Sequence, residues 1–247
     1  MLRPNLLTID IGNSTIDCRA ADGTRLRLPT APRAAGALRD FARRTAARAA
    51  MLVSVVPPAL QWVQAELRAA ALPDPVRLAG IDVPCPLRLD YDTPQTLGAD
   101  RWVGALAAHR RFGRAVVVDC GSATTVNLVD IDGTFRGGAI APGLRAMAAG
   151  MAAVTPALPP ARFDAQPTMP PRDTQAAIDT GVLLGYCGLV EKLVAASLRA
   201  SSGPAQVLVT GGNAERLLAH SVLQVLHEPD LVHQGLGFLA DTVPWSS

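Results

Sequence analysis

Residues 6–24 read LLTIDIGNSTIDCRAADGT, and residues 115–134 read AVVVDCGSATTVNLVDIDGT. In both stretches an apolar strand ends in an aspartate, a glycine and a small polar residue follow, and a second strand leads to an Asp-Gly turn. The two copies differ by one residue in the distance from the first aspartate to the Asp-Gly turn. Each copy therefore predicts a three-stranded antiparallel meander, and together they indicate an internal duplication.

The glycine of each motif joins two strands, whereas the glycine loop of a P-loop or a dinucleotide-binding motif opens a helix. One Asp-x-Gly turn alone is compatible with an ordinary hairpin, but two copies with matching flanks favour a shared function. The only lysine, Lys192, lies in Glu-Lys-Leu and not in Gly-Lys-Ser/Thr, which excludes a Walker-type nucleoside triphosphatase.

The duplicated motif resembles the ribonuclease-H-like halves of the superfamily that contains acetate and sugar kinases, heat-shock ATPases and actin. This resemblance implies an α/β fold of two duplicated ribonuclease-H-like domains, residues 1–113 and 114–247, with mixed sheets flanked by helices. It also implies a cleft between the halves in which the two turns hold the phosphates of ATP. Glycine suits such turns because a residue without Cβ lets the backbone approach a phosphate closely.

Hydrophobic periodicity predicts the remaining elements of a layered α/β arrangement. Helices are predicted over residues 35–50, 59–71, 96–111 and 174–200, and strands over residues 51–56, 76–79 and 206–210. A short helix is expected after Gly211 and Gly212, and the proline-rich residues 156–171 predict an irregular connection.

The chain has 247 residues, of which 49% are hydrophobic, enough for two compact halves with buried cores. No uninterrupted apolar run approaches the roughly 18 residues of a membrane span, and Asp10 follows the first apolar residues too early for a signal peptide. We therefore expect a soluble, cytoplasmic protein that does not bind membranes. The net charge of +2 is spread along the chain, so no nucleic-acid partner is expected.

The four cysteines lack Cys-x-x-Cys spacing, which predicts reduced and mostly buried thiols and neither a zinc site nor disulfides. They are Cys18, Cys85, Cys120 and Cys187. The four histidines show no metal-binding spacing, and surface or capping roles are expected for them. They are His109, His220, His227 and His233.

Three segments resemble, in order, motifs of the type III pantothenate kinases. They are Asp10-Ile-Gly-Asn-Ser14, Gly98-Ala-Asp-Arg101 with Tyr91 before it, and Asp119-Cys-Gly-Ser-Ala-Thr-Thr125. Further blocks of the family are matched by residues 137–143, by Ala177-Ile178 with Gly181, by Thr210-Gly-Gly212, and by Gly235-Leu236. The Gly-Ala-Asp-Arg segment separates this family from other kinases of the superfamily.

The resemblance implies transfer of the γ-phosphate of ATP to the primary hydroxyl of pantothenate, the first step towards coenzyme A. The residues implied in ATP and phosphate binding are Asp10, Ile11, Gly12, Asn13, Ser14, Thr15, Ile16, Asp17, Ser122, Gly211 and Gly212. Asp10 is expected to organise Mg²⁺, directly or through water. Asp119 matches a residue that helps relatives bind a monovalent cation, K⁺ or NH₄⁺. Gly211 and Gly212 border the adenosine in this reading, and a plain strand-to-helix turn is the alternative.

The residues implied in substrate binding are Tyr91, Gly98, Ala99, Asp100, Arg101 and Thr174. Asp100 is the expected general base for the attacking hydroxyl, although an aspartate early in a helix also suits the helix dipole. Arg101 offers a planar cation for polar or anionic groups of pantothenate, and a structural ion pair is its alternative role. Tyr91 offers a phenol or a stacking face.

Thr174 matches a pantothenate-contacting threonine that relatives place near a dimer interface. Gly181, Gly185 and Gly188 follow at i, i+4 and i+7 and form one smooth helix face. This face suits either a subunit interface or packing within the chain, and the family resemblance favours a homodimer.

Three residues depart from the family pattern. Ser122 stands where many relatives have threonine, and Asp173 stands where asparagine is usual. Asp17 is acidic at a position that is often apolar or basic. Two other functions remain open: a superfamily kinase for another small hydroxylated substrate, and an accessory protein of gene regulation without kinase activity.

Overall fold

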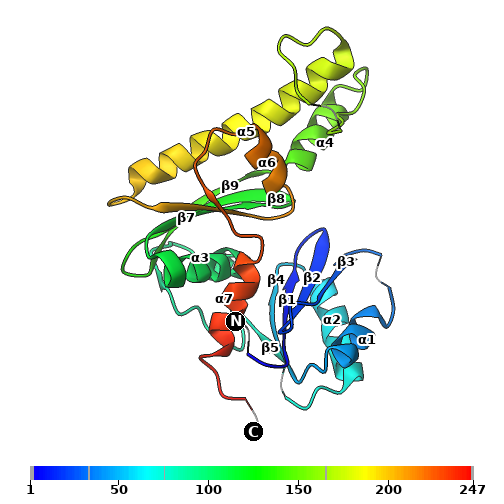
Figure 1. Ribbon diagram of the computed structural model, residues 1–247, viewed down its shortest axis with the longest axis vertical. Helices are drawn as coiled ribbons and strands as arrows, with labels where there is room; N and C mark the ends of the chain where they lie inside the picture. Colours follow the sequence, from blue (N-terminus) through cyan, green and yellow to red (C-terminus); the bar gives the residue numbers. More distant parts are fainter. Residues whose placement is uncertain (1–2, 33, 75, 165, 246–247) are drawn as a thin grey trace. The chain divides into compact units, whose positions relative to one another are not determined.

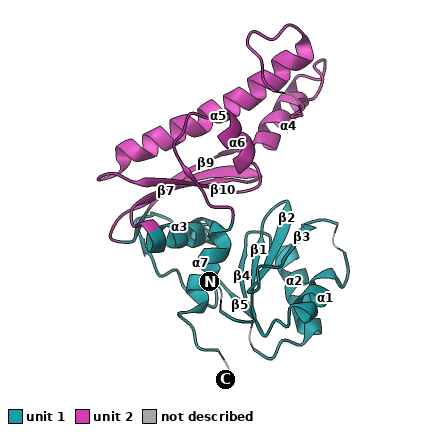
Figure 2. Ribbon diagram, viewed as in Figure 1, with its two compact units in different colours: residues 1–111, 133–135, 230–247 teal, residues 112–132, 136–229 magenta. Residues whose placement is uncertain are grey.

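A computed structural model describes residues 3–32, 34–74, 76–164 and 166–245 (Figure 1). The chain forms two compact units (Figure 2). Unit 1 comprises residues 1–111, 133–135 and 230–247, and unit 2 comprises residues 112–132 and 136–229. Both units therefore contain segments that are distant in sequence, and a domain division after residue 113 stays a prediction.

The sheet of unit 1 has the strand order β3-β2-β1-β4-β5. Its strands are β1 (Leu6–Ile11), β2 (Thr15–Ala20), β3 (Arg25–Pro29), β4 (Ala49–Ser54) and β5 (Val76–Leu78). The first three strands are antiparallel neighbours, which confirms the meander predicted for the first copy of the motif. Strand β4 runs parallel to β1, and β5 runs parallel to β4.

The two faces of this sheet differ in chemistry. Leu7, Ile9 and Ile11 point to one face and belong to the apolar core formed with α1 (Ala37–Arg44) and α2 (Pro57–Ala70). Because side chains alternate along a strand, Thr8 and Asp10 lie on the opposite face.

That opposite face is covered by α7 (Leu231–Ala240), which packs on β1 and β4. Helix α3 (Ala99–Phe112) lies against α7, and a Cβ at Gly235 would overlap the backbone of Val103. The last helix of the chain is therefore an integral layer of unit 1.

The sheet of unit 2 has the strand order β11-β10-β7-β8-β9. Its strands are β7 (Ala115–Cys120), β8 (Ala123–Val129), β9 (Thr134–Pro142), β10 (Gln206–Thr210) and β11 (Leu226–His227). β7 and β8 are antiparallel, as predicted for the second copy, and β10 is parallel to β7. The short β6 (Arg88–Leu89), followed by a 3₁₀ turn at Pro94–Thr96, pairs with the first two residues of β9 within unit 1.

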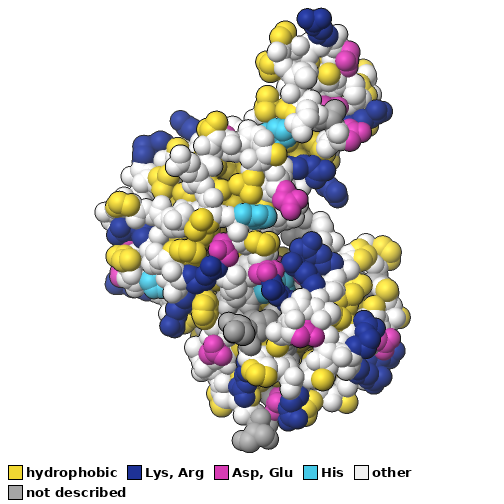
Figure 3. All heavy atoms as spheres, in the orientation of Figure 1, with side chains coloured by type: hydrophobic (Ala, Val, Ile, Leu, Met, Phe, Trp, Pro, Cys, Tyr) yellow, Lys and Arg dark blue, Asp and Glu magenta, His cyan; other side chains and the backbone are white. Residues whose placement is uncertain are grey.

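One face of the unit 2 sheet packs against α4 (Leu144–Val154), α5 (Thr174–Ala200) and α6 (Ala214–His220). Helix α5 is long and apolar enough to cross a membrane by length and composition alone, a property it shares with core helices of soluble proteins. Its buried side chains, among them Tyr186 and Val190, belong to the unit 2 core. Figure 3 shows basic and acidic side chains interspersed on the face that it displays.

The sequence predicted α5 and β10 with the observed bounds. The helix predicted over residues 35–50 is wrong in its last part, because α1 ends at Arg44 and β4 begins at Ala49. Alanine favours helix locally, but pairing with β1 decides the conformation of this segment. The described part of residues 156–171 contains no helix or strand, in line with the predicted irregular connection.

The sequence also predicted the environments of the histidines and the cysteines. The surface or capping role expected for His233 is wrong, because this side chain is only 4% exposed. Cys18, Cys120 and Cys187 are buried free thiols, as predicted.

Candidate active site

The first Asp-x-Gly turn is a tight hairpin that is held by hydrogen bonds from Thr30. The Gly12 N–H donates to the Thr15 carbonyl at 2.9 Å. The hydroxyl of Thr30 donates to the Gly12 carbonyl at 2.7 Å, and its backbone N–H donates to the Ser14 carbonyl at 3.1 Å. Asn13 and Ser14 stay exposed at the tip. Sequence reasoning missed Thr30. Its position just beyond the third strand of the motif was the one feature that could have pointed to it.

Asp10 faces Asp17 directly across this hairpin. Two carboxylates in such a pair repel each other unless cations compensate. Arg25 donates to both oxygens of Asp17, at 2.7 and 2.5 Å, and Arg27 Nε donates at 2.9 Å. Burial favours the protonated form of Asp17, but interactions with His233 and Arg25 outweigh it and hold the pKa of this carboxyl well below its usual range.

The side chain of Asp17 is therefore fully engaged by the protein, which explains how the chain tolerates an acidic residue at this position. Its predicted contact with ATP stays a prediction. The neighbouring strand residues Ile11 and Ile16 are buried in the core, so only their backbone groups are available to a ligand.

The Gly98–Arg101 segment begins α3 and lies next to the end of β1. The Val55 N–H donates to the Ile11 carbonyl at 3.2 Å, and the Cβ position of Gly98 lies 3.8 Å from Val55 Cγ1. The same Cβ position lies only 2.6 Å from Asp100 Oδ1. Glycine at this position therefore leaves room for the carboxylate beside the first turn.

Asp100 lies in the first turn of α3, and its Oδ1 atom accepts the backbone N–H of Arg101 at 2.9 Å. Burial raises the pKa of Asp100 above its ordinary value of 3.8, although the N–H and the charge of Arg101 act in the opposite direction. A raised pKa makes the carboxylate a better proton acceptor.

Arg101 is 7% exposed and lies beside two neighbouring aromatic rings, whose centroids are 6.2 Å apart. Its guanidinium carbon lies 5.8 Å from the ring centroids of both Tyr91 and Phe135, within cation–π range. The sequence prediction assigned both Arg101 and Tyr91 to substrate binding but missed Phe135, which follows the second Asp-Gly turn and joins unit 1.

The second Asp-x-Gly turn is held by close backbone contacts. A Cβ at Gly143 would overlap the carbonyls of Gly121 and Ser122, and a Cβ at Gly211 would overlap Asp119 Oδ1 and the backbone of Cys120. Gly211 also has φ +92°, in the left-handed region.

Asn213 completes this second turn by donating its side-chain N–H groups to the carbonyls of Cys120 and Gly121, both at 3.2 Å. The chain thus brings Asp119, Ser122 and Gly211 together within unit 2. Sequence reasoning missed Gly143 as a support of this turn and did not assign Asn213.

Thr174 is exposed at the start of α5. The preceding Asp173 caps this helix by accepting the Ala176 N–H at 2.8 Å. An acidic residue at this position therefore has a structural role, because a carboxylate at a helix N-terminus satisfies a backbone donor and the helix dipole.

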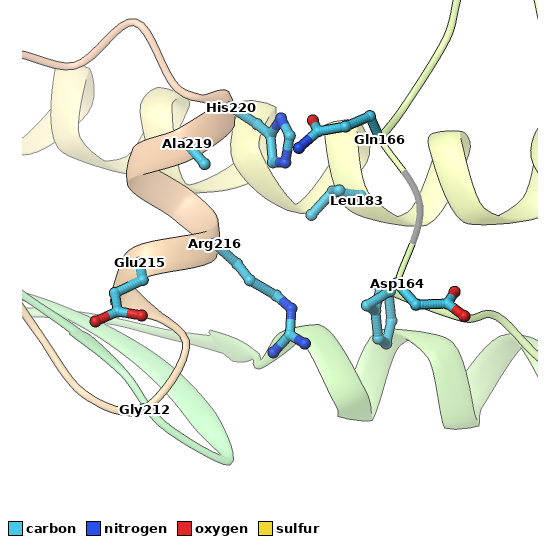
Figure 4. Close-up of a pocket in the computed structure, with 9 residues that line it drawn as sticks. Asp164, Gln166, Leu183, Gly212, Glu215, Arg216, Ala219 and His220 are labelled. Atoms are coloured by element: carbon cyan, nitrogen blue, oxygen red, sulfur yellow. The ribbon is translucent and has the colours of Figure 1, made fainter.

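A pocket of about 370 Å³ lies in unit 2 and is lined by residues of α6 and α5 and by Phe163, Asp164 and Gln166 (Figure 4). Of the predicted site residues it contains only Gly212. The guanidinium of Arg216 lies 5.9 Å from the Phe163 ring centroid at its wall. Among the described residues no group of three or more histidine, cysteine, aspartate or glutamate side chains could hold a metal ion.

Residues 6–196 match the family model for type III pantothenate kinase. The chain belongs to the type III pantothenate kinase family. A type III pantothenate kinase of Rhizorhabdus wittichii is 35% identical over 96% of this chain and 97% of its own. One of Rhodopirellula baltica is 42% identical over 63% of this chain and 58% of its own.

Solved structures support the fold assignment. A Campylobacter jejuni protein described as a Baf family transcriptional activator has a TM-score of 0.60 at 20% identity, covering 96% of this chain and 98% of its own. A ROK family glucokinase of Streptomyces griseus has a TM-score of 0.50 at 13% identity, covering 96% of this chain and 98% of its own. At these identities the likeness concerns the fold alone, and it agrees with the duplicated α/β architecture predicted from the repeat.

Proposed function

We propose that this protein transfers the γ-phosphate of ATP to the primary hydroxyl of pantothenate and forms 4′-phosphopantothenate and ADP, the first step of coenzyme A biosynthesis. Its family consists of kinases, and the proposal assigns their activity to this chain. The observation that supports it most is the Gly98–Arg101 segment, which lies near the end of β1 and carries the partly buried carboxylate of Asp100.

In this reaction a bond forms between the hydroxyl oxygen of pantothenate and the γ-phosphorus, while the bond from phosphorus to the bridging oxygen of ADP breaks. Asp100 orients the hydroxyl and accepts its proton, a role that suits a carboxylate whose pKa burial has raised. Asp100 belongs to the rigid first turn of α3, which favours accurate positioning.

The phosphates are held by the first turn, where Asn13 and Ser14 offer backbone or side-chain donors and Gly12 lets the backbone come close to a phosphate. A divalent metal, Mg²⁺ in this proposal, would be held by Asp10 together with the phosphates, which fits an ion that keeps few protein ligands. When bound, Mg²⁺ supplies positive charge that offsets the charge of the phosphates.

We assign further contacts with the nucleotide to the second turn. Asp119 would hold a monovalent cation, K⁺ or NH₄⁺, and the exposed Ser122 hydroxyl would donate to a phosphate. The exposed Gly212, with Gly211, would border the adenosine.

Pantothenate would bind next to Asp100 through Arg101, whose guanidinium is fixed by the rings of Tyr91 and Phe135. A planar cation held in this way suits a carboxylate or amide group of the substrate. Arg101 then acts as a specificity residue and not as a surface charge.

We assign the Gly181, Gly185 and Gly188 face of α5 to a homodimer interface, with Thr174 near the partner's pantothenate. A Cβ at any of these glycines would meet no described atom within 4 Å, so packing within the chain does not account for them. Light scattering on the purified protein tests the dimer directly. The proposed compartment is the cytoplasm.

The function is tested by incubating the protein with Mg-ATP and a panel of small hydroxylated acids, with ADP release as the readout. Each reaction is run with K⁺, NH₄⁺ or Na⁺, and the product is identified by mass spectrometry. We expect phosphopantothenate with K⁺ or NH₄⁺. Turnover of another acid would assign a different kinase activity, and no turnover with any cation would favour the accessory-protein reading.

A further inference from the structure

A buried polar network joins helix α7 to the strand that carries Asp10. His233 on α7 is 4% exposed, and Thr8 on β1 is fully buried. His233 Nδ1 lies 2.9 Å from Thr8 Oγ1, and His233 Nε2 lies 3.6 Å from Asp17 Oδ1. Thr8 stands two residues before Asp10 on the same sheet face, and Asp17 stands opposite Asp10. The network therefore contacts both strands of the first turn.

The neighbouring groups constrain where the hydrogens of this network lie. The Asp17 carboxylate favours a hydrogen on Nε2, the ring nitrogen that lies 3.6 Å from it. Burial lowers the pKa of His233, Asp17 opposes this effect, and the charges of Arg25 and Arg19 add to it, so the ring is neutral near pH 7. The Thr8 hydroxyl lies 2.9 Å from His233 Nδ1 and 3.2 Å from the Arg19 carbonyl, so its single hydrogen serves one of these two acceptors.

The residue that precedes α7 belongs to the same network. Asp230 occupies the N-cap position, where an aspartate usually accepts an N–H of the first turn, but its side chain makes no such bond. Its carboxylate pairs instead with Arg19 of β2 and Arg25 of β3. The N-terminus of α7 thus lacks a side-chain capping hydrogen bond, and Asp230 instead forms ion pairs with arginines of the sheet.

Fold stability alone is a weak explanation for this network. Desolvation of charged groups offsets their attraction, and apolar residues of similar volume often stabilise a fold as well or better. The opposite face of the same sheet is built in that apolar way against α1 and α2. Charged groups are concentrated on the face that carries Asp10.

We propose that His233 is a positioning residue of the nucleotide site: through Thr8 and Asp17 it holds β1 and β2 in the arrangement in which Asp10 and the first turn bind Mg-ATP. The inference rests on the proposed function for the identity of the ligand. Helix α7 then belongs to the nucleotide site by acting on these strands, and its docking is a condition for tight nucleotide binding.

The test measures binding of the magnesium complex of a non-hydrolysable ATP analogue by calorimetry. His233→Ala is expected to raise the Kd about five- to tenfold and the milder Thr8→Val about threefold, the effect of losing one or two buried hydrogen bonds. The double variant is expected to bind only slightly more weakly than His233→Ala. Both changes break the Thr8–His233 contact, and Thr8→Val removes in addition the hydrogen bond to the Arg19 carbonyl. His233→Gln is expected to stay near the original Kd, since its amide offers both a donor and an acceptor.

The matched control is Asp74→Asn, which removes a largely buried carboxylate, 3.6 Å from Arg48 Nε, in the same unit and away from β2. It is expected to lower the melting temperature without changing the Kd. In steady-state assays His233→Ala should raise the KM for ATP and leave the KM for pantothenate within twofold.

Folded His233→Ala and Thr8→Val proteins with unchanged Kd would overturn the inference, and so would equal losses in Asp74→Asn. If the unsubstituted protein binds the analogue but does not phosphorylate pantothenate, the proposed function fails while the Kd comparison still decides the role of His233. If it does not bind the analogue at all, both proposals fail.

Discussion

In the first Asp-x-Gly turn the aspartate faces a second carboxylate across the hairpin, whereas in the second turn Asp119 faces Thr125. The negative charge at the first turn is accordingly compensated by arginine side chains, since Arg25 and Arg27 bind Asp17. The second turn has no such carboxylate pair and is fixed by glycines whose Cβ atoms would not fit. Equal motifs are thus stabilised by charge in one copy and by close backbone packing in the other.

The largest expected effect is on stability, and it distinguishes a turn stabilised by charge from a turn stabilised by close backbone packing. Gly211→Ala places a Cβ on Asp119 and Cys120 at a φ of +92°, and we expect it to lower the free energy of unfolding by about 3 kcal/mol. Gly12→Ala meets only Thr15 O at 3.5 Å, so its cost should stay below about 1 kcal/mol. Chemical denaturation measures both, and equal losses would show that the turns are supported alike.

The next effect concerns the segment beside the first turn. Gly98→Ala brings a Cβ within 2.6 Å of Asp100 Oδ1, and we expect the displaced carboxylate to lower kcat about tenfold with little change in stability. Gly150→Ala, in open space on α4, is the control and should keep the original kcat. An unchanged kcat in Gly98→Ala would mean that the position of Asp100 does not matter for turnover.

Thr30→Val tests the fastening of the first turn. The loss of the 2.7 Å hydrogen bond to Gly12 should cost about 1 kcal/mol of stability and raise the KM for ATP about fivefold. Thr45→Val removes a hydroxyl bond to Phe41 O in the same unit and should leave that KM unchanged. If both variants have the original KM, the shape of this turn does not limit ATP binding.

The smallest effect is a change of stability with pH. The depressed pKa of Asp17 means that the unfolded chain binds more protons between the two pKa values, so this stabilisation is complete above the ordinary value of 3.8 and is lost as the pH falls below it. Asp17→Asn should therefore flatten the acid limb of the melting-temperature profile. A limb as steep as in the original protein would place the titrating groups elsewhere.

The fold was predictable because its determinants are local. The repeated strand-turn-strand pattern fixed both meanders, and the long apolar period of residues 174–200 fixed α5. The failure at residues 45–50 came from alanine, whose helix preference is overridden by pairing with β1. No local signal distinguishes such a segment from the end of a helix.

The supporting residues of the site were not predictable in the same way. Thr30, Phe135 and His233 act through contacts with residues that are distant in sequence, and single polar or aromatic residues carry no spacing signal. Asp17 is a different case. Its place in the motif suggested a role at the phosphate site, but the partners of its side chain, Arg25 and His233 of α7, could not be predicted from the motif.

The most direct test of the whole account is the rate of phosphopantothenate formation by Asp100→Asn under saturating Mg-ATP and K⁺. The asparagine keeps the size of the side chain and removes its capacity to accept the proton, so we predict a kcat at least about a hundredfold lower, with nucleotide affinity unchanged. Equal kcat values for the two proteins would contradict the account.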